Sequence, residues 1–203
     1  RDLNLGMNKI SDLTPLQNLT ALVNLDLGLG GNPFNSKDGP NIFATGTNLI
    51  TNITALAGLV NLQYLNLIGD DLLTDIGGVS TMNSLQQLWL GSTPIADFTP
   101  LNGVADTLML LALINTGIHN ADMTIINGMT LGIGLAFIGE SNLTDISGLT
   151  GINPGFIFAI MMTPITDISV AANYTNLQQL QVEMAPITTI PDLSGLTSLQ
   201  QAN

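Results

Sequence analysis

Cysteine is absent from this 203-residue sequence, and histidine occurs once, as His119. Cysteine–histidine catalysis and a histidine-rich zinc site are therefore excluded. A Ser-His-Asp triad would have to be built around His119, beside Asn120 and Asp122, but nothing nearby indicates an oriented base or an oxyanion site. The two glutamates, Glu140 and Glu183, are better explained as solvated charges than as a glycosidase pair. We therefore predict no enzymatic activity and no cofactor.

Positive charge is also scarce. Arg1, Lys9 and Lys37 face fifteen acidic residues, so the formal net charge is −12. That balance excludes nucleic acid and an anionic membrane surface as partners. The longest apolar runs, residues 108–114 and 156–162, are too short to cross a bilayer, and no signal-peptide pattern opens the sequence. We expect no membrane-spanning segment.

A repeat of about 22 residues dominates what the sequence does contain. Apolar residues recur at positions 1, 4, 6, 11, 14, 17 and 20 of each unit, most clearly at Leu177, Leu180, Val182, Ile187, Ile190, Leu193 and Leu196. Earlier units begin at Leu22, Leu62, Leu85, Leu108, Ile133 and Gly155, and a first unit lacks its start. With 45% apolar residues and this period, the sequence predicts a packed solenoid of about eight units.

The repeat reads L-x-x-L-x-L-x-x-N-x-I-x-D-I-x-x-L-x-x-L-x-x, best seen in NKISDLTPLQNLT at residues 8–20 and NLTDISGL at residues 142–149. This pattern resembles the leucine-rich repeat of the internalin type, found on bacterial surfaces. The resemblance implies a right-handed arc with one parallel β-sheet on its concave face and short 3₁₀ or extended convex segments. We expect a single leucine-rich-repeat domain over residues 1–203, as a segment of a longer chain.

Period-two geometry at positions 4 and 6 predicts short strands whose apolar side chains point inward. The expected strands are centred on Leu3–Leu5, Leu25–Leu27, Leu65–Leu67, Leu88–Leu90, Leu111–Leu113, Ala136–Ile138, Phe158–Ile160 and Leu180–Val182.

Position 9 departs from the family, in which asparagines at this position form a ladder along the turns. The sequence has Asn8, Gly30, Asp70, Thr93, Thr116, Ser141, Thr163 and Ala185 there. Hydroxyl and carboxyl groups bond turn backbone with fewer donors and acceptors than an amide. We therefore expect the solenoid without a regular asparagine ladder.

The second unit, from Leu22 to Leu62, is 40 residues long, so about 18 residues are inserted at about 28–46. Its Asn32, Asn35 and Asp38, with Asp70 and Asp71 nearby, offer oxygen ligands for calcium. Because the spacing matches no EF-hand and acidic loop residues are most often solvated, we predict no metal site. The insertion is either functional or a tolerated surface loop.

Positions 3, 5 and 7 of each unit should face the concave side, and in the middle units they are apolar. The resulting strip consists of Tyr64, Ile68, Trp89, Leu110, Ile114, Leu135, Phe137, Ile157 and Met161. A contiguous exposed apolar patch marks a binding surface, and Trp and Tyr dominate interface energies. We predict that the strip binds a protein partner and that Trp89 and Phe137 are more than a quarter exposed. The open alternative is that the insertion, or a shifted register, buries some of them.

Four N-x-S/T sequons, at Asn18, Asn52, Asn142 and Asn173, fall on the convex or turn side. They are glycan acceptors in a glycosylating secretory pathway, or chance matches in a repeat rich in Asn and Thr.

Net acidity and few lysines favour an extracellular or cell-surface protein that binds another protein. The alternative is a structural subunit that assembles end to end into a filament through uncapped terminal units, where Leu3 and Leu5 would pack on Leu180 and Val182.

Overall fold

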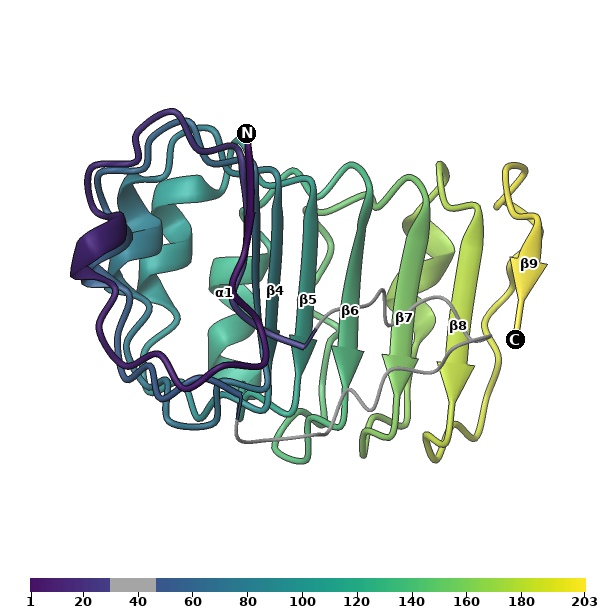
Figure 1. Ribbon diagram of the computed structural model, residues 1–203. Helices are drawn as coiled ribbons and strands as arrows, with labels where there is room; N and C mark the ends of the chain where they lie inside the picture. The colour runs from purple at the N-terminus through teal and green to yellow at the C-terminus, as the bar shows by residue number, and fades with distance from the viewer. Residues whose placement is uncertain (30–46) are drawn as a thin grey trace.

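Parallel strands stack along one side of the molecule in the computed structural model, which describes residues 1–29 and 47–203. They form a nine-stranded sheet in which each strand pairs with the next along the chain (Figure 1). The strands are β1 (Asp2–Asn4), β2 (Asn24–Asp26), β3 (Tyr64–Ile68), β4 (Gln87–Gly91), β5 (Leu110–Ile114), β6 (Gly134–Ile138), β7 (Ile157–Met161), β8 (Gln179–Glu183) and β9 (Gln201–Ala202). The predicted leucine-rich-repeat solenoid is confirmed.

Short helical turns lie on the opposite side of most units (Figure 1). They are the 3₁₀ helices η1 (Thr14–Leu16), η2 (Thr54–Leu56), η3 (Gly77–Thr81), η4 (Thr99–Val104), η5 (Asn120–Asp122) and η6 (Ser169–Asn173), and the α-helix α1 (Met123–Ile126). Several begin after an aspartate whose side chain accepts the backbone N–H two residues on. Asp97 Oδ1 accepts from Thr99 N at 2.8 Å, and Asp167 Oδ1 from Ser169 N at 2.7 Å. Asx turns of this kind start η4 and η6.

The core lies between the sheet and the helical turns. In the middle units the leucines at positions 4 and 6, such as Leu88 and Leu90, are fully buried. The apolar residues on the convex side of these units, such as Ile95, Phe98 and Leu101, are buried as well. Together they form one continuous apolar cluster from Leu13 to Leu196. Because no unit can bury its own leucines, each unit is stabilised by its neighbours.

Strand β6 has a register one residue away from the one we predicted. Leu135 pairs with Leu111 and Phe137 with Leu113, so both side chains enter the core and are 0% exposed. Ala136, which we expected to point inward, faces the other side. A shift of one residue reverses every side chain of a strand, so the larger Leu135 and Phe137 fill the main core, and Ala136 and Ile138 pack in a second apolar cluster on the other face. The extra residue of this unit lies in the turn after β6, between Phe137 and Leu143, rather than in the convex part.

Two position-9 assignments are also wrong. In the second unit the ladder residue is Asn48, whose Nδ2 donates to the carbonyls of Leu5 and Leu27 and whose Oδ1 accepts from Ile10 N at 3.0 Å. Gly30, our prediction, lies outside the described residues. The insertion therefore falls between Leu29, at position 8, and Asn48, at position 9. In the sixth unit, position 9 is the buried Glu140 rather than Ser141.

A left-handed residue at position 8 ends most strands of the sheet. Met7, Ser92, Asn115, Met162 and Met184 have φ between 52° and 57° there. In the third and sixth units this residue is a glycine, Gly69 with φ of 89° and Gly139 with φ of 70°. Glycine adopts this conformation without steric cost. Both of these glycines are followed by a buried acidic residue, which lines the next turn.

Candidate partner-binding surface

The side of the sheet that faces away from the core carries a second apolar cluster. Its members are Ile68, Trp89, Leu110, Ala112, Ile114, Ala136, Ile138, Ile157 and Ala159. Trp89 is 5% exposed, and Leu110 is 4% exposed. The predicted exposure of Trp89 is therefore wrong, because its indole packs within this cluster instead of projecting into solvent.

The structure therefore places only some of the nine predicted strip residues on one side of the sheet. Ile68, Trp89, Leu110, Ile114 and Ile157 lie on the expected side of the sheet but are buried. Tyr64 and Met161 pack against the same cluster and are half-buried. Leu135 and Phe137 belong to the main core because of the register of β6. Only Tyr64 and Met161 of the nine predicted residues retain substantial contact with solvent.

An exposed apolar edge, which we did not predict, lies beside this cluster. Met109 is 39% exposed, Phe156 is 44% exposed, and Ile133 between them is half-buried. They occupy position 2 of consecutive units, since Ile133 N donates to Met109 O at 2.8 Å and Phe156 N to Ile133 O at 2.9 Å. We call these three residues the apolar ridge. Aligning position 2 across units would have revealed it, but we considered only positions 3, 5 and 7.

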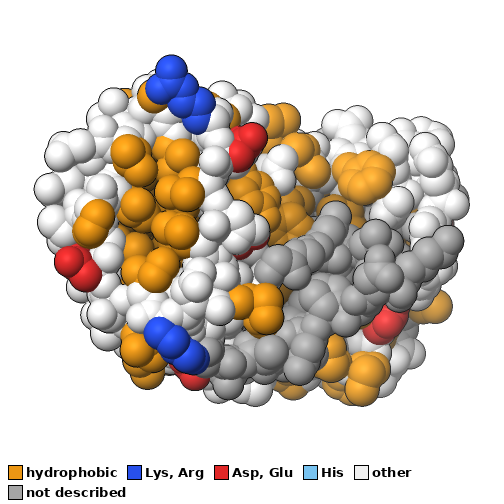
Figure 2. Space-filling model, viewed as in Figure 1, with side chains coloured by type: hydrophobic (Ala, Val, Ile, Leu, Met, Phe, Trp, Pro, Cys, Tyr) orange, Lys and Arg blue, Asp and Glu red, His pale blue; other side chains and the backbone are white. Residues whose placement is uncertain are grey.

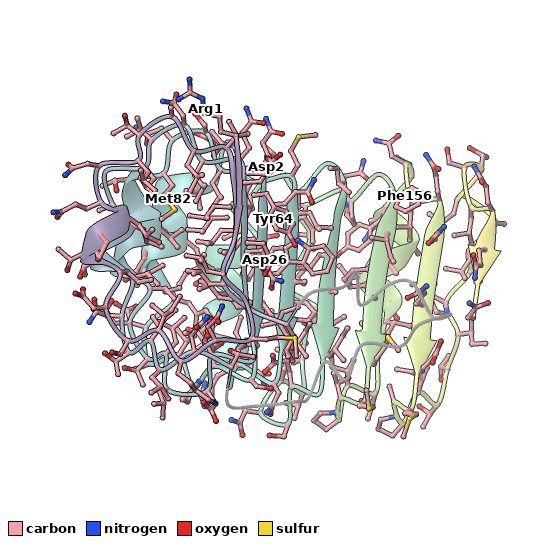
Figure 3. The ribbon with its side chains drawn as sticks, viewed as in Figure 1. Arg1, Asp2, Asp26, Tyr64, Met82 and Phe156 are labelled. Carbon is pink, nitrogen blue, oxygen red and sulfur yellow. The ribbon has the colours of Figure 1, made fainter. Side chains whose placement is uncertain are left out.

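The ridge is continuous with the buried cluster and bordered by uncharged polar residues. Ile133 packs directly against the cluster. The same position is occupied by the exposed Gln86 in the fourth unit and by the half-buried Gln178 in the eighth. Figure 3 labels Phe156 near the start of β7. An apolar centre with a polar rim is the arrangement of protein interfaces.

A polar network covers the first three strands on the same side. Asp26 accepts hydrogen bonds from Asn4 Nδ2 at 3.1 Å and from Asn66 Nδ2 at 2.9 Å. Burial raises the pKa of the Asp26 carboxyl, and burial beside Asp26 raises the pKa of Tyr64 to about 12. Asp2, Asp26 and Tyr64 lie along this part of the sheet in Figure 3. The concave side is therefore acidic near β1 and β2 and apolar further along.

Two buried carboxylates stabilise the turns after the strands in the same way. Glu140 accepts hydrogen bonds from Thr116 N, Thr116 Oγ1 and Gly117 N at 2.8, 2.9 and 3.0 Å. Asp70 Oδ1 accepts from Thr47 Oγ1 at 2.8 Å and Asn48 N at 3.2 Å. Each acidic residue thus bonds position 9 of the preceding unit. Burial raises the pKa of Glu140 and raises the pKa of Asp70 to about 7. Our expectation that Glu140 is a solvated charge is wrong.

The candidate chemical groups lie in different surroundings. The His119 side chain is 63% exposed, and its Nδ1 lies 3.8 Å from Asp122 Oδ2, at the start of η5. Glu183 is exposed at the end of β8, whereas Glu140 is fully bonded within its turn. Within residues 1–29 and 47–203, no group of three or more acidic, histidine or cysteine side chains could hold a metal ion. Asn32, Asn35 and Asp38 lie outside those residues.

Exposed groups occur at the sequons and at both ends of the solenoid. Asn18, Asn52, Asn142 and Asn173 are all exposed.

Apolar side chains gather inside the first turn (Figure 2), where Leu3 and Leu5 are partly buried. At the other end a cavity of about 330 Å³ is lined by Ile168, Leu180, Val182, Ala185, Ile187, Ile190, Leu193, Ala202 and Asn203. These end surfaces are those that the filament alternative would use.

Comparison with solved structures places this fold among bacterial leucine-rich-repeat proteins. An internalin (InlF) from Listeria monocytogenes aligns over 96% of this chain and 51% of its own, with 29% identity and a TM-score of 0.73. Internalin C2 from the same organism aligns over 100% and 70%, with 24% identity and a TM-score of 0.57. A leucine-rich-repeat protein from Leptospira interrogans aligns over 98% and 47%, with 17% identity and a TM-score of 0.75.

The chain thus spans about half the length of two of these proteins. No family model matches the sequence, and a search of curated proteins finds no match. In the part of the chain that the structure describes, no helix is long and apolar enough to cross a membrane.

Proposed function

We propose that this chain, an internalin-like leucine-rich-repeat protein, recognises a protein partner at the cell surface or outside the cell. The internalin and leucine-rich-repeat neighbours support a protein-binding fold. One observation carries the proposal for this chain: the apolar ridge of Met109, Ile133 and Phe156 is solvent-accessible and continuous with the apolar side of the sheet. Tyr64 and Met161, half-buried on the same side, extend the contact surface.

The ridge has the properties of an interface centre. Its residues directly precede strands β5, β6 and β7, and backbone hydrogen bonds join them from unit to unit, so little backbone entropy is lost when a partner binds. Phe156 offers a large apolar side chain that is still 44% exposed in the isolated chain. Truncating such an anchor typically costs about 2 kcal/mol or more of binding free energy.

The test compares wild-type protein with Phe156→Ser and with the control Leu72→Ser. Leu72 is 47% exposed in the turn after β3, so its replacement alters exposed apolar area equally but leaves the ridge intact. Both variants should keep wild-type stability. Probed against an array of extracellular protein domains, wild type and Leu72→Ser should capture the same domain, and Phe156→Ser should bind it at least about tenfold more weakly. A partner bound equally by all three proteins would refute the proposed surface.

The second candidate function is self-association through the ends, and the apolar end cavity supports it. Ile190, which lines that cavity, is 75% exposed. If copies stack there, sedimentation should show concentration-dependent oligomers, and Ile190→Glu should disperse them. Val60→Glu, at an exposed residue away from the cavity, serves as the control. Monomers at all concentrations would exclude this candidate.

A further inference from the structure

We infer that the partner segment bound on the apolar ridge is basic: an apolar anchor flanked by lysine or arginine side chains. This inference rests on the proposed function and specifies its partner. It follows from the distribution of charge around the ridge, together with the absence of any charge on the ridge itself.

The charge of this chain is distributed very unevenly. Residues 47–203 contain eleven acidic side chains and neither lysine nor arginine. The ridge residues and all strands from β3 to β9 lie in this part. With His119 neutral, every formal charge in residues 47–203 is therefore negative. Asp106, an exposed acid three residues before Met109, is the closest of them along the chain.

The contact surface itself is neutral. Met109, Ile133 and Phe156 are bordered at the same repeat position by Gln86 and Gln178, and glutamine can both donate and accept hydrogen bonds. No fixed charge would be desolvated when an apolar side chain docks here. The complementary partner therefore places an apolar residue on the ridge and its cationic groups outside it, where they meet the acidic surround.

The negative charge of residues 47–203 disfavours acidic partners and gives neutral ones no advantage. An acidic segment docking here would be repelled at every approach, since residues 47–203 carry no cation to oppose the field. A neutral segment would gain nothing from that field. Only a basic segment gains, and it gains mainly in association rate, because the field extends over about 8 Å at physiological salt.

The experiment selects partners without assuming their charge. A random 12-residue peptide library is panned on wild-type protein and counter-selected against Phe156→Ser, which removes the apolar contact without changing charge. The Leu72→Ser control must retain every selected peptide. We expect the ridge-dependent peptides to be enriched in lysine or arginine next to an aromatic or aliphatic residue.

The salt dependence of a selected peptide supplies the second measurement. Its association rate constant should fall by about tenfold between 50 and 300 mM NaCl, as expected for electrostatically steered encounters. Ridge-dependent peptides that are neutral or acidic, or a rate that does not depend on salt, would overturn the inference and leave the proposed function standing. If no peptide depends on Phe156, the proposed function fails together with the inference.

Discussion

Replacing Asp70 with asparagine should stabilise the protein at pH 8 and change its stability little at pH 4. Asp70 is fully buried in the turn after β3. Its Oδ1 accepts two hydrogen bonds, from Thr47 and Asn48, whereas its Oδ2 has no hydrogen-bond partner among the described residues. Two hydrogen bonds do not compensate an ionised carboxylate for its lost hydration. Burial therefore raises the pKa of Asp70 to about 7.

The direction of the effect follows from proton binding. Between pH 4 and 7 the folded chain keeps the Asp70 proton while the unfolded chain has lost it, so the free energy of unfolding falls as pH rises. Raising the pKa from 3.8 to about 7 corresponds to a loss of about 4 kcal/mol once the group is ionised in both states. The contribution of the protonated Asp70 to the free energy of unfolding is fully present below pH 4 and is lost as pH rises to 7 and above. An asparagine keeps the acceptor for Thr47 and Asn48 and cannot ionise.

The assay is equilibrium urea unfolding followed by the fluorescence of Trp89, at pH 4, 6 and 8. The variant should exceed wild type by up to about 4 kcal/mol at pH 8 and by much less at pH 4. Asp106→Asn removes an exposed charge instead and should follow the wild-type pH profile. If wild type and Asp70→Asn lose stability in parallel between pH 4 and 8, the carboxyl of Asp70 does not titrate in this range and the reasoning fails.

Three further predictions concern the core, the turns and the stability of the protein at acidic pH. Phe137→Ala should lower the free energy of unfolding by about 3–5 kcal/mol, because it opens a cavity in the core. Phe156→Ala, at an exposed residue, should lower it by less than about 1 kcal/mol. Equal urea midpoints for the two variants would contradict the register of β6. Asn48→Ala should destabilise the protein by about 2–4 kcal/mol in thermal unfolding, because the Leu27 carbonyl and the Ile10 N–H lose their Asn48 partner, and the Leu5 carbonyl keeps only its bond from Asn8. The exposed Asn83→Ala should be neutral in the same measurement. Hydrogen bonds from the Ser or Thr two residues later lower the pKa of five aspartates: Asp12, Asp97, Asp145, Asp167 and Asp192. Their contribution to the free energy of unfolding is present above pH 4 and should be lost as pH falls further, so the melting temperature should fall. A melting temperature that keeps rising down to pH 2 would contradict this prediction.

Repeat period and alternation were enough to establish the architecture of this chain. Apolar residues at fixed positions of a 22-residue unit can be buried together only if the units stack, and this single requirement placed eight of the nine strands within a residue or two. The resemblance to internalins added the type of solenoid. The absence of cysteine and the scarcity of histidine and basic residues likewise excluded cysteine–histidine catalysis and nucleic-acid binding, regardless of the fold.

Register and exposure, in contrast, were decided by the tertiary structure. Near Leu135 and Phe137 the sequence offers two frames that differ by one residue, and only packing against Leu111 and Leu113 selects the frame that buries the larger side chains. Asn48 became a ladder residue because three backbone groups of neighbouring units converge on it, across an insertion that interrupts the repeat count. The solvent exposure of a side chain is a property of all its spatial neighbours, which is why Trp89, within a strand, is 5% exposed, whereas Phe156, directly before a strand, is 44% exposed. Periodicity determines which way a side chain points, and three-dimensional packing alone determines whether water reaches it.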